Sequence, residues 1–324
     1  MWLAPDLSFM FWRATAALAG RLAQMGAGPE RLVAVALNRS AELPMALVAA
    51  MRAGAGYLPL DPDHPPERLA RILQLARPVA VLTSPDLAHL FPADAPILLT
   101  TAWPESGDAP NTPPGPDDMA YVIYTSGSTS DPKGVVHTHA SLIGHQRSLN
   151  EIRALTESDR LFCNSPFFWI GGVLAAMGAL HAPVTLLVMA RLDAEVALDL
   201  AESERATGIV GWPAFTQRMR EHPSFGERDL SSAPMLRDGP LDIAMTKVPD
   251  GFPVHRTMSE TAGGFAFTEM KIVDDAGAPV ADGTVGELLV RGVGVAGESG
   301  TGDLERRLGQ RAADHREPGL APRE

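Results

Sequence analysis

A buried strand that runs into a loop of small hydroxyl residues is the feature that most constrains this fold. Residues 120–124 form a short apolar run rich in β-branched and aromatic side chains, which predicts a core strand. Residues 125–130 then supply five hydroxyl groups and one glycine. Pro132, Lys133 and Gly134 turn the chain and place one cation beside the loop. Backbone N–H groups, hydroxyls and an ammonium group can all donate hydrogen bonds to an anion.

This loop differs from the Walker A phosphate loop, in which glycine precedes the lysine and serine or threonine follows it. Here Pro132 precedes Lys133, and Gly134 follows it. The alternative interpretation is an ordinary surface loop with a solvated lysine. The preceding strand and the Pro-Lys-Gly ending favour a site for a polyphosphate.

Composition and charge limit the class of protein. The chain has 324 residues, of which 45% are hydrophobic, and this is enough for more than one subdomain. A formal net charge of −12 argues against nucleic acid as the main partner. Cys163 is the only cysteine, so no intrachain disulfide can form. It lies in an apolar run, which predicts a core residue rather than a nucleophile.

One apolar segment, residues 169–190, contains no Asp, Glu, Lys or Arg and is long enough to span a bilayer. Glycines and the sequence His181-Ala182-Pro183 interrupt it. A buried helix, a turn and a strand at 184–189 are therefore predicted, with a membrane span as the alternative. The N-terminus has no basic segment before an apolar run, so we expect no secretory signal and a cytoplasmic location.

Strands alternate with helices along most of the chain, which predicts an α/β fold with parallel sheets covered by helices. Later, residues 270–291 contain two strands around a Gly, Pro and Asp turn, which predicts a small antiparallel β subdomain. Residues 297–324 are charged and poor in large apolar residues, which predicts disorder. We expect an α/β core at 1–250, a barrel-like β subdomain at 251–295 and a disordered tail at 296–324. Strands are predicted at 31–37, 54–62, 79–82, 134–139, 160–165 and 207–212, and helices at 7–25, 41–53, 66–76, 141–155, 193–203 and 214–221.

Residues 125–134, Thr-Ser-Gly-Ser-Thr-Ser-Asp-Pro-Lys-Gly, resemble the phosphate-loop signature of the adenylate-forming enzymes. This family includes acyl- and aryl-CoA synthetases, luciferases and the adenylation domains of nonribosomal peptide synthetases. Residues 54–69 and 270–291 are similar to two further family segments, and residues 255–261 resemble the family's Tyr-Gly-Met-Thr-Glu-Thr motif. The resemblance implies the two-subdomain N-terminal large domain of these enzymes, truncated at both ends.

The resemblance also implies a site for ATP and Mg²⁺. In the family the phosphate loop binds the phosphates, and the carboxylate that matches Glu260 helps to hold Mg²⁺. Lys133 and Glu260 are thus the expected catalytic residues, and Thr129 and Glu260 the expected metal ligands. This chain departs from the family at Ser130, where glycine is usual, and at Arg256, where an aromatic residue usually covers adenine. The implied nucleotide-binding residues are Thr125, Ser126, Gly127, Ser128, Thr129, Ser130, Lys133, Gly239, Ser259 and Asp303, although for Asp303 a chance match is the alternative.

The family places its acid pocket at the start of the helix that follows residues 166–172, which implies Phe168, Trp169 and Gly211 as pocket residues. Peptide synthetase adenylation domains carry an Asp here that holds the α-amino group of the substrate. This segment offers aromatic side chains and no carboxylate. Because a buried ammonium group without a counter-charge is costly, we expect a simple fatty or aryl acid. Core packing is the alternative for each aromatic residue.

The implied activity is ATP-dependent conversion of a carboxylic acid to an acyl-AMP, followed by transfer to CoA or to the phosphopantetheine of a carrier protein. The only lysines are Lys133, Lys247 and Lys271, so the family's C-terminal domain, with its own lysine, is expected to be absent. A carrier protein and a separately encoded C-terminal domain are the expected partners. One alternative is a truncated, catalytically impaired homologue that retains at most nucleotide binding. Another is an unrelated α/β domain with a coincidental loop.

A pair of histidines follows the loop. His137 and His139 are spaced for one face of a strand, so a metal pair is conceivable. Since no third ligand is apparent nearby, we interpret the two histidines as polar residues that lie beside the loop and bind no metal.

Overall fold

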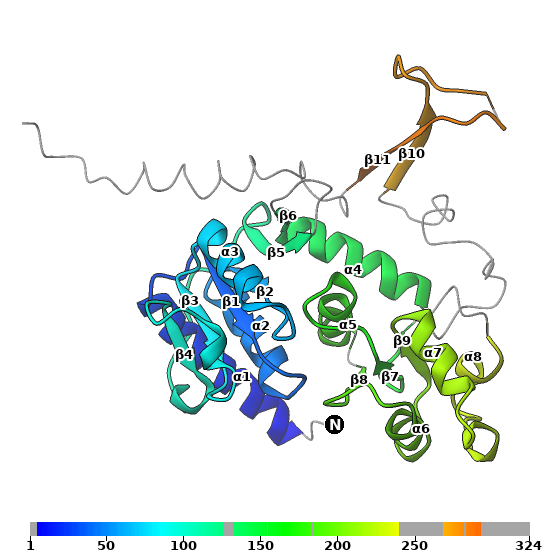
Figure 1. The fold of residues 1–324 in the computed structure, drawn as a ribbon, viewed down its shortest axis with the longest axis horizontal. Coiled ribbons are helices and arrows are strands. Elements are labelled where there is room, and N and C mark those ends of the chain that lie inside the picture. The colour runs from blue at the N-terminus through cyan, green and yellow to red at the C-terminus, as the bar shows by residue number, and fades with distance from the viewer. Residues whose placement is uncertain are drawn as a thin grey trace, which may run out of the picture. The chain divides into compact units, whose positions relative to one another are not determined.

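The computed structural model describes residues 5–125, 132–153, 155–182, 184–239, 268–281 and 283–292. The described chain divides into two compact units, Pro5–His139 and Ala140–Val295 (Figure 1). This division confirms the expected two-part α/β architecture. The predicted boundaries near residues 250 and 296 lie outside the described residues and stay predictions.

A six-stranded sheet forms the centre of the first unit, in the order β4-β3-β1-β2-β5-β6. The five strands from β4 to β5 run parallel, as predicted, whereas β6 runs antiparallel to β5. A parallel return requires a crossover of a dozen or more residues, and the connection from β5 to β6 is shorter. The strands are β1 (Leu32–Ala36), β2 (Gly56–Pro59), β3 (Ala80–Thr83), β4 (Ile97–Leu99), β5 (Met119–Thr125) and β6 (Lys133–Thr138).

Three helices belong to the first unit: α1 (Pro5–Gln24), α2 (Glu42–Arg52) and α3 (Pro66–Ala76). Helix α3 begins with proline at its first position and is followed by Arg77, whose φ of 44° is left-handed and ends the helix. Helix α1 packs against α2, and Arg52 donates hydrogen bonds to Trp12 O (2.7 Å) and Thr15 Oγ1 (2.8 Å). Two short 3₁₀ helices, η1 (Ala88–Leu90) and η2 (Thr100–Ala102), complete this unit.

The second unit is built on a three-stranded parallel sheet in the order β8-β7-β9. Cys163, at the end of β7, is buried in this core, as predicted. The predicted antiparallel pair is confirmed as β10 and β11. The strands are β7 (Arg160–Cys163), β8 (Thr185–Leu187), β9 (Gly208–Val210), β10 (Thr268–Val273) and β11 (Glu287–Gly292); the helices are α4 (His139–Arg153), α5 (Ile170–His181), α6 (Ala194–Ser203), α7 (Pro213–Arg220), α8 (Pro234–Asp238) and the 3₁₀ helix η3 (Phe225–Glu227).

The apolar segment at 169–190 forms α5, a break and β8, which confirms the helix, turn and strand interpretation. Among the described residues, no helix combines the length and the apolar character that a bilayer crossing needs.

The amino ends of β7 and β9 are joined by a buried carboxylate. Asp159 accepts hydrogen bonds from Thr156 N (2.8 Å), Thr156 Oγ1 (3.0 Å) and Thr207 Oγ1 (2.9 Å). Thr207 Oγ1 in turn accepts a hydrogen bond from Arg160 N (3.0 Å). These contacts fix the register of β7 and β9 at their amino ends. They therefore also fix the positions of the residues that follow the carboxyl ends of the two strands.

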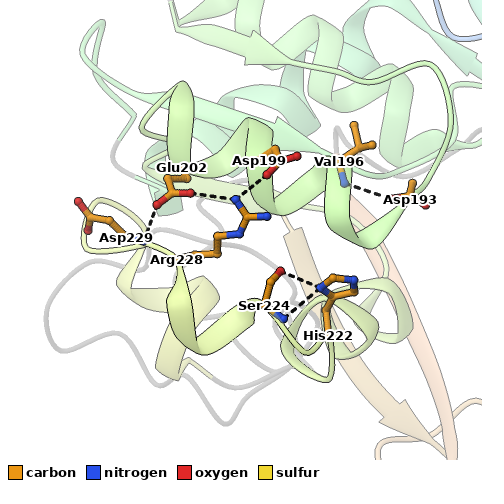
Figure 2. A network of polar contacts seen from close by, with 8 residues as sticks. All are labelled: Asp193, Val196, Asp199, Glu202, His222, Ser224, Arg228 and Asp229. Carbon is orange, nitrogen blue, oxygen red and sulfur yellow. Dashed lines mark hydrogen bonds and ion pairs between the residues drawn. The ribbon is translucent and has the colours of Figure 1, made fainter.

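A second polar network attaches the segment after α7 to α6 (Figure 2). Arg228 Nη1 contacts Asp199 Oδ1 (2.5 Å) and Glu202 Oε2 (3.2 Å), and Asp229 N donates to Glu202 Oε1 (2.8 Å). The hydrogen bond from the Asp229 backbone, together with the Arg228 guanidinium, holds the pKa of Glu202 below its usual value. Asp193 caps the start of α6 by accepting from Val196 N (3.0 Å).

This lowered pKa predicts a pH dependence of stability. Since the pKa of Glu202 is lower in the folded than in the unfolded protein, its contribution is complete above the unfolded value of about 4.3 and is lost as pH falls through the folded value. Glu202→Gln is therefore expected to lower the melting temperature near neutral pH and to make it less sensitive to acid. Thermal unfolding followed by circular dichroism between about pH 6 and pH 3 measures this. Glu195→Gln, on the same helix, is the matched control, and an equal change in acid sensitivity for both variants would refute the assignment.

Candidate functional site

The two ends of the hydroxyl loop are held together by strand pairing. Thr125, the last residue of β5, lies directly opposite Lys133, the first residue of β6. Thr125 Oγ1 donates a hydrogen bond to Lys133 O (3.4 Å). Both residues are partly exposed, whereas Pro132 is buried. The antiparallel pair therefore closes the loop at its base and fixes the backbone of its lysine beside the base.

Most of the predicted nucleotide ligands lie outside the described residues. They comprise Ser126, Gly127, Ser128, Thr129, Ser130, Ser259 and Asp303, and the predicted metal ligand Glu260 also lies outside the described residues. The binding of an anion by the loop, and the meeting of Lys133 with Glu260 around Mg²⁺, thus stay predictions.

Packing on the face of β6 that carries Lys133 is aromatic. Residues alternate between the two faces of a strand, so Lys133, Val135 and His137 share one face. The ring of His137 stacks on Tyr121 with centroids 4.7 Å apart and planes at 14°. Tyr121 also lies opposite Tyr57 on β2, and burial raises the pKa of both phenols, so they stay neutral at physiological pH. His137 therefore has a packing partner within the sheet.

The prediction that His139 ends the same strand was wrong. Strand β6 ends at Thr138, and His139 begins α4, where its backbone N–H donates to Asp118 O (3.1 Å). Burial lowers the pKa of His139, and the charge of Asp118 opposes this shift. Within the described ranges, no group of three or more His, Cys, Asp and Glu side chains could hold a metal ion.

A second cluster forms where β7 and β9 end. Parallel strands place their carboxyl ends at one edge, which is where ligands bind in α/β sheets. Asn164 follows β7, and its backbone N–H donates to Val210 O (2.8 Å) at the end of β9. The buried side chain of Asn164 accepts a hydrogen bond from Trp212 N at Oδ1 (2.6 Å). The two strand ends are thus tied together by a side chain as well as by the backbone.

Gly211 is required by this contact. A Cβ atom added at residue 211 would overlap the side-chain amide of Asn164. The glycine therefore gives the buried amide room to reach the backbone of Trp212.

One predicted pocket residue, Trp169, contacts Trp212, which follows Gly211 after β9. Trp169 immediately precedes α5 and Trp212 immediately precedes α7. Their rings pack edge to face, with centroids 6.5 Å apart and planes at 89°. Phe168 is partly exposed, while Phe167 is buried in the core. The structure therefore brings Trp169 next to the residue that follows Gly211, and whether these residues bind an acid stays a prediction.

Gly239, one of the implied nucleotide-binding residues, follows α8. The guanidinium of Arg220 on α7 donates to Leu236 O (2.8 Å), Met235 O (2.9 Å) and Gly239 O. These bonds satisfy carbonyl groups at the end of α8, which a helix cannot satisfy internally. Arg220 therefore fixes the place at which the chain leaves α8.

Sequence reasoning missed Asn164, Trp212 and Arg220. A signal existed for the first two, because Asn164 follows one apolar strand and the sequence Gly-Trp-Pro follows a neighbouring one. Arg220 lies in the last turn of an amphipathic helix, where an arginine is usually solvated. The sequence around it therefore did not indicate that it contacts α8.

Comparisons with known proteins agree with this architecture. The family described as AMP-binding enzyme matches residues 10–241. The nonribosomal peptide synthetase CymA of Salinispora arenicola is 31% identical over 317 residues, which cover 86% of this chain and 4% of that protein. A dimodular nonribosomal peptide synthase of Bacillus subtilis is 29% identical, with coverage of 86% and 13%. This chain thus spans a small part of the length of these two relatives.

Solved structures show the same fold. The N-terminal domain of FACL13 from Mycobacterium tuberculosis superposes with a TM-score of 0.73 at 21% identity, covering 88% of this chain and 82% of that one. The nonribosomal peptide synthetase FmoA3 superposes with a TM-score of 0.74 at 26% identity, covering 91% of this chain and 37% of that one. The chain belongs to the AMP-binding, adenylate-forming enzyme family, whose members include peptide synthetase adenylation domains and acyl-CoA synthetases.

Proposed function

We propose that this chain activates a carboxylic acid with ATP to form an acyl-AMP and pyrophosphate. The observation that carries the proposal is the pairing of Thr125 with Lys133, which closes a hydroxyl-rich loop at its base in a chain of the AMP-binding family. The related FmoA3 structure was solved in its α-methyl-L-serine-AMP-bound form, an adduct of the same type.

The reaction requires a site that stabilises growing negative charge. A carboxylate oxygen attacks the α-phosphorus of ATP, the bond from this phosphorus to the bridging oxygen breaks, and pyrophosphate leaves with that electron pair. Negative charge grows on the phosphate oxygens, so the site must supply positive charge and hydrogen-bond donors. Lys133 and the hydroxyls of Thr125, Ser126, Ser128 and Thr129 would supply them. Glu260 and Thr129 have the oxygen atoms that Mg²⁺ prefers and would hold this ion against the phosphates.

The acid is proposed to be a simple carboxylic acid. The relatives above are peptide synthetases, whereas residues 164–172 of this chain offer no carboxylate for an α-amino group. Transfer of the acyl group to CoA or to the phosphopantetheine of a carrier protein would follow, with a carrier protein or a further domain as partner. We propose a cytoplasmic location, because the reaction consumes ATP and the cytoplasm supplies it.

Exchange of labelled pyrophosphate into ATP tests the proposal over a panel of carboxylic acids. We expect exchange that depends on one class of acid and on Mg²⁺. A folded protein whose melting temperature rises with ATP but which exchanges with no acid would instead be a catalytically impaired homologue. Ser130 and Arg256 replace residues usual in the family and favour that second candidate.

A further inference from the structure

We propose that the first turns of α1 form an interaction surface for a second copy of this chain, with the two α1 helices packed antiparallel about a twofold axis. The inference is independent of the proposed reaction. It rests on the exposure of large apolar side chains in α1, on the contacts that hold them, and on a charge pattern that is complementary to itself.

Large apolar side chains are uncovered at the start of α1. Phe9 is 62% exposed, Met10 is 60% exposed and Trp12 is 49% exposed, and all three lie within four positions of one helix. Farther along the same helix, Leu18 and Leu22 are buried in the core. One exposed apolar residue needs no explanation, whereas a group of them indicates an interaction site. The first turns of α1 are therefore a candidate surface for a partner.

Two arginines hold the aromatic rings of this surface. The guanidinium of Arg13 lies 5.8 Å from the centroid of the Phe9 ring, and that of Arg52 lies 5.2 Å from the centroid of the Trp12 ring. Arg52, on α2, also donates a hydrogen bond to Trp12 O (2.7 Å). Because these side chains are already held in the free chain, they lose less conformational entropy when a partner binds.

Arg13 carries a charge that its own fold does not neutralise. Its side chain is exposed, and within the part of the chain that the structure describes it makes no ion pair. A cation beside exposed apolar groups favours a partner that combines apolar groups with a carboxylate. The sequence has such a residue in α1 itself, because Asp6 stands seven positions before Arg13. Two helical turns separate them, so positions 6 and 13 lie on the same side of the helix.

This stripe of α1 is complementary to a second copy of itself. Positions 6, 9, 10 and 13 have the i, i+3, i+4, i+7 spacing of one helix face. In an antiparallel pair with the twofold axis between positions 9 and 10, position 6 lies opposite position 13, and position 9 lies opposite position 10. Asp6 of each copy is then opposite Arg13 of the other, and Phe9 is opposite Met10, a favourable pairing of an aromatic ring with sulfur. A parallel pair would bring two Arg13 cations together, so charge selects the antiparallel arrangement.

Analytical ultracentrifugation of the full chain, with charge exchange between Asp6 and Arg13, tests the inference. We expect a reversible monomer–dimer equilibrium at up to about 100 μM protein, because two helical turns per copy form a small interface of roughly micromolar affinity. Arg13→Glu and Asp6→Arg should each weaken the dimer at least about tenfold, since each replaces attraction by repulsion at two symmetric contacts. The double variant restores opposite charges and should return the dissociation constant to within about threefold of the original value.

Arg21→Glu is the matched control, because it makes the same charge change at an exposed arginine in the last turn of α1. It should leave the monomer–dimer equilibrium unchanged. Melting curves distinguish a lost contact from a lost fold, and the double variant decides the comparison if a single variant unfolds.

A chain that stays monomeric over the whole concentration range would overturn the inference. So would a dimer that Arg13→Glu leaves unaltered, because its contact would lie on another surface. If the double variant dimerises no better than the single variants, the antiparallel register is wrong. An equal loss for Arg21→Glu would show that net charge, and not the contact between the two α1 helices, governs association.

Discussion

Replacing Lys133 with glutamine is expected to lower acid-dependent pyrophosphate exchange by at least about a hundredfold. Lys133 is the only lysine in the stretch 125–134, and its pairing with Thr125 holds it at the base of the loop. Glutamine keeps a polar side chain of similar reach but has no charge to stabilise the growing charge on the phosphates. Initial exchange rates at saturating acid measure the effect. The loss should fall mainly on the rate, because the charge develops in the transition state.

Lys271→Gln is the matched control for this substitution. Lys271 lies in β10, outside the loop, and carries the same formal charge. Its replacement should leave the exchange rate within about twofold of the original value, as for a surface change. Equal losses for the two variants would show that net charge, and not the position of Lys133, governs the reaction.

The second large effect is expected at the strand ends. Gly211→Ala should lower the free energy of unfolding by about 3 kcal/mol, because the new Cβ displaces the amide of Asn164 and breaks its bond to Trp212 N. Asn164→Ala alone should cost about 1–2 kcal/mol, since it removes one buried hydrogen bond. In the double variant the clash is absent, so the combined loss should be smaller than the sum. Urea denaturation measures the free energy of unfolding of the unaltered protein, the two single variants and the double variant.

Gly226→Ala provides the control for this cycle. It lies in η3 of the same unit, and a Cβ there would meet no atom within 4 Å. Its effect on unfolding should stay within about 0.5 kcal/mol. Strict additivity of Gly211→Ala and Asn164→Ala would contradict the contact between these two residues.

Sequence periodicity was sufficient for most of the fold. The helix predicted at 66–76 is α3, because proline at its start and a hydrophobic repeat define it. Strands β1, β7 and β9 lie within the predicted ranges, since continuous apolar runs mark buried parallel strands. Strand β4 and helix α8 were not predicted. Helix α8 has only five residues, which is too short for a helical period to be visible.

Tertiary contacts account for what the sequence did not show at the site. The bond from Trp212 to Asn164 joins residues 48 positions apart, and no local pattern encodes it. The three bonds from Arg220 to α8 likewise depend on how two helices pack. The family resemblance implied Trp169 and Gly211 as pocket residues, and the structure packs Trp169 against Trp212, the residue after Gly211. Their role in binding an acid stays a prediction.

Binding of ATP to the loop is the central claim, and titration calorimetry of ATP against the unaltered chain and Lys133→Gln tests it most directly. We expect ATP to bind the unaltered chain. Lys133→Gln should lower the affinity for ATP at least about tenfold and the affinity for AMP much less, because AMP lacks the β- and γ-phosphates. Equal affinity of both proteins for ATP, or no binding of ATP to the folded chain, would contradict the claim.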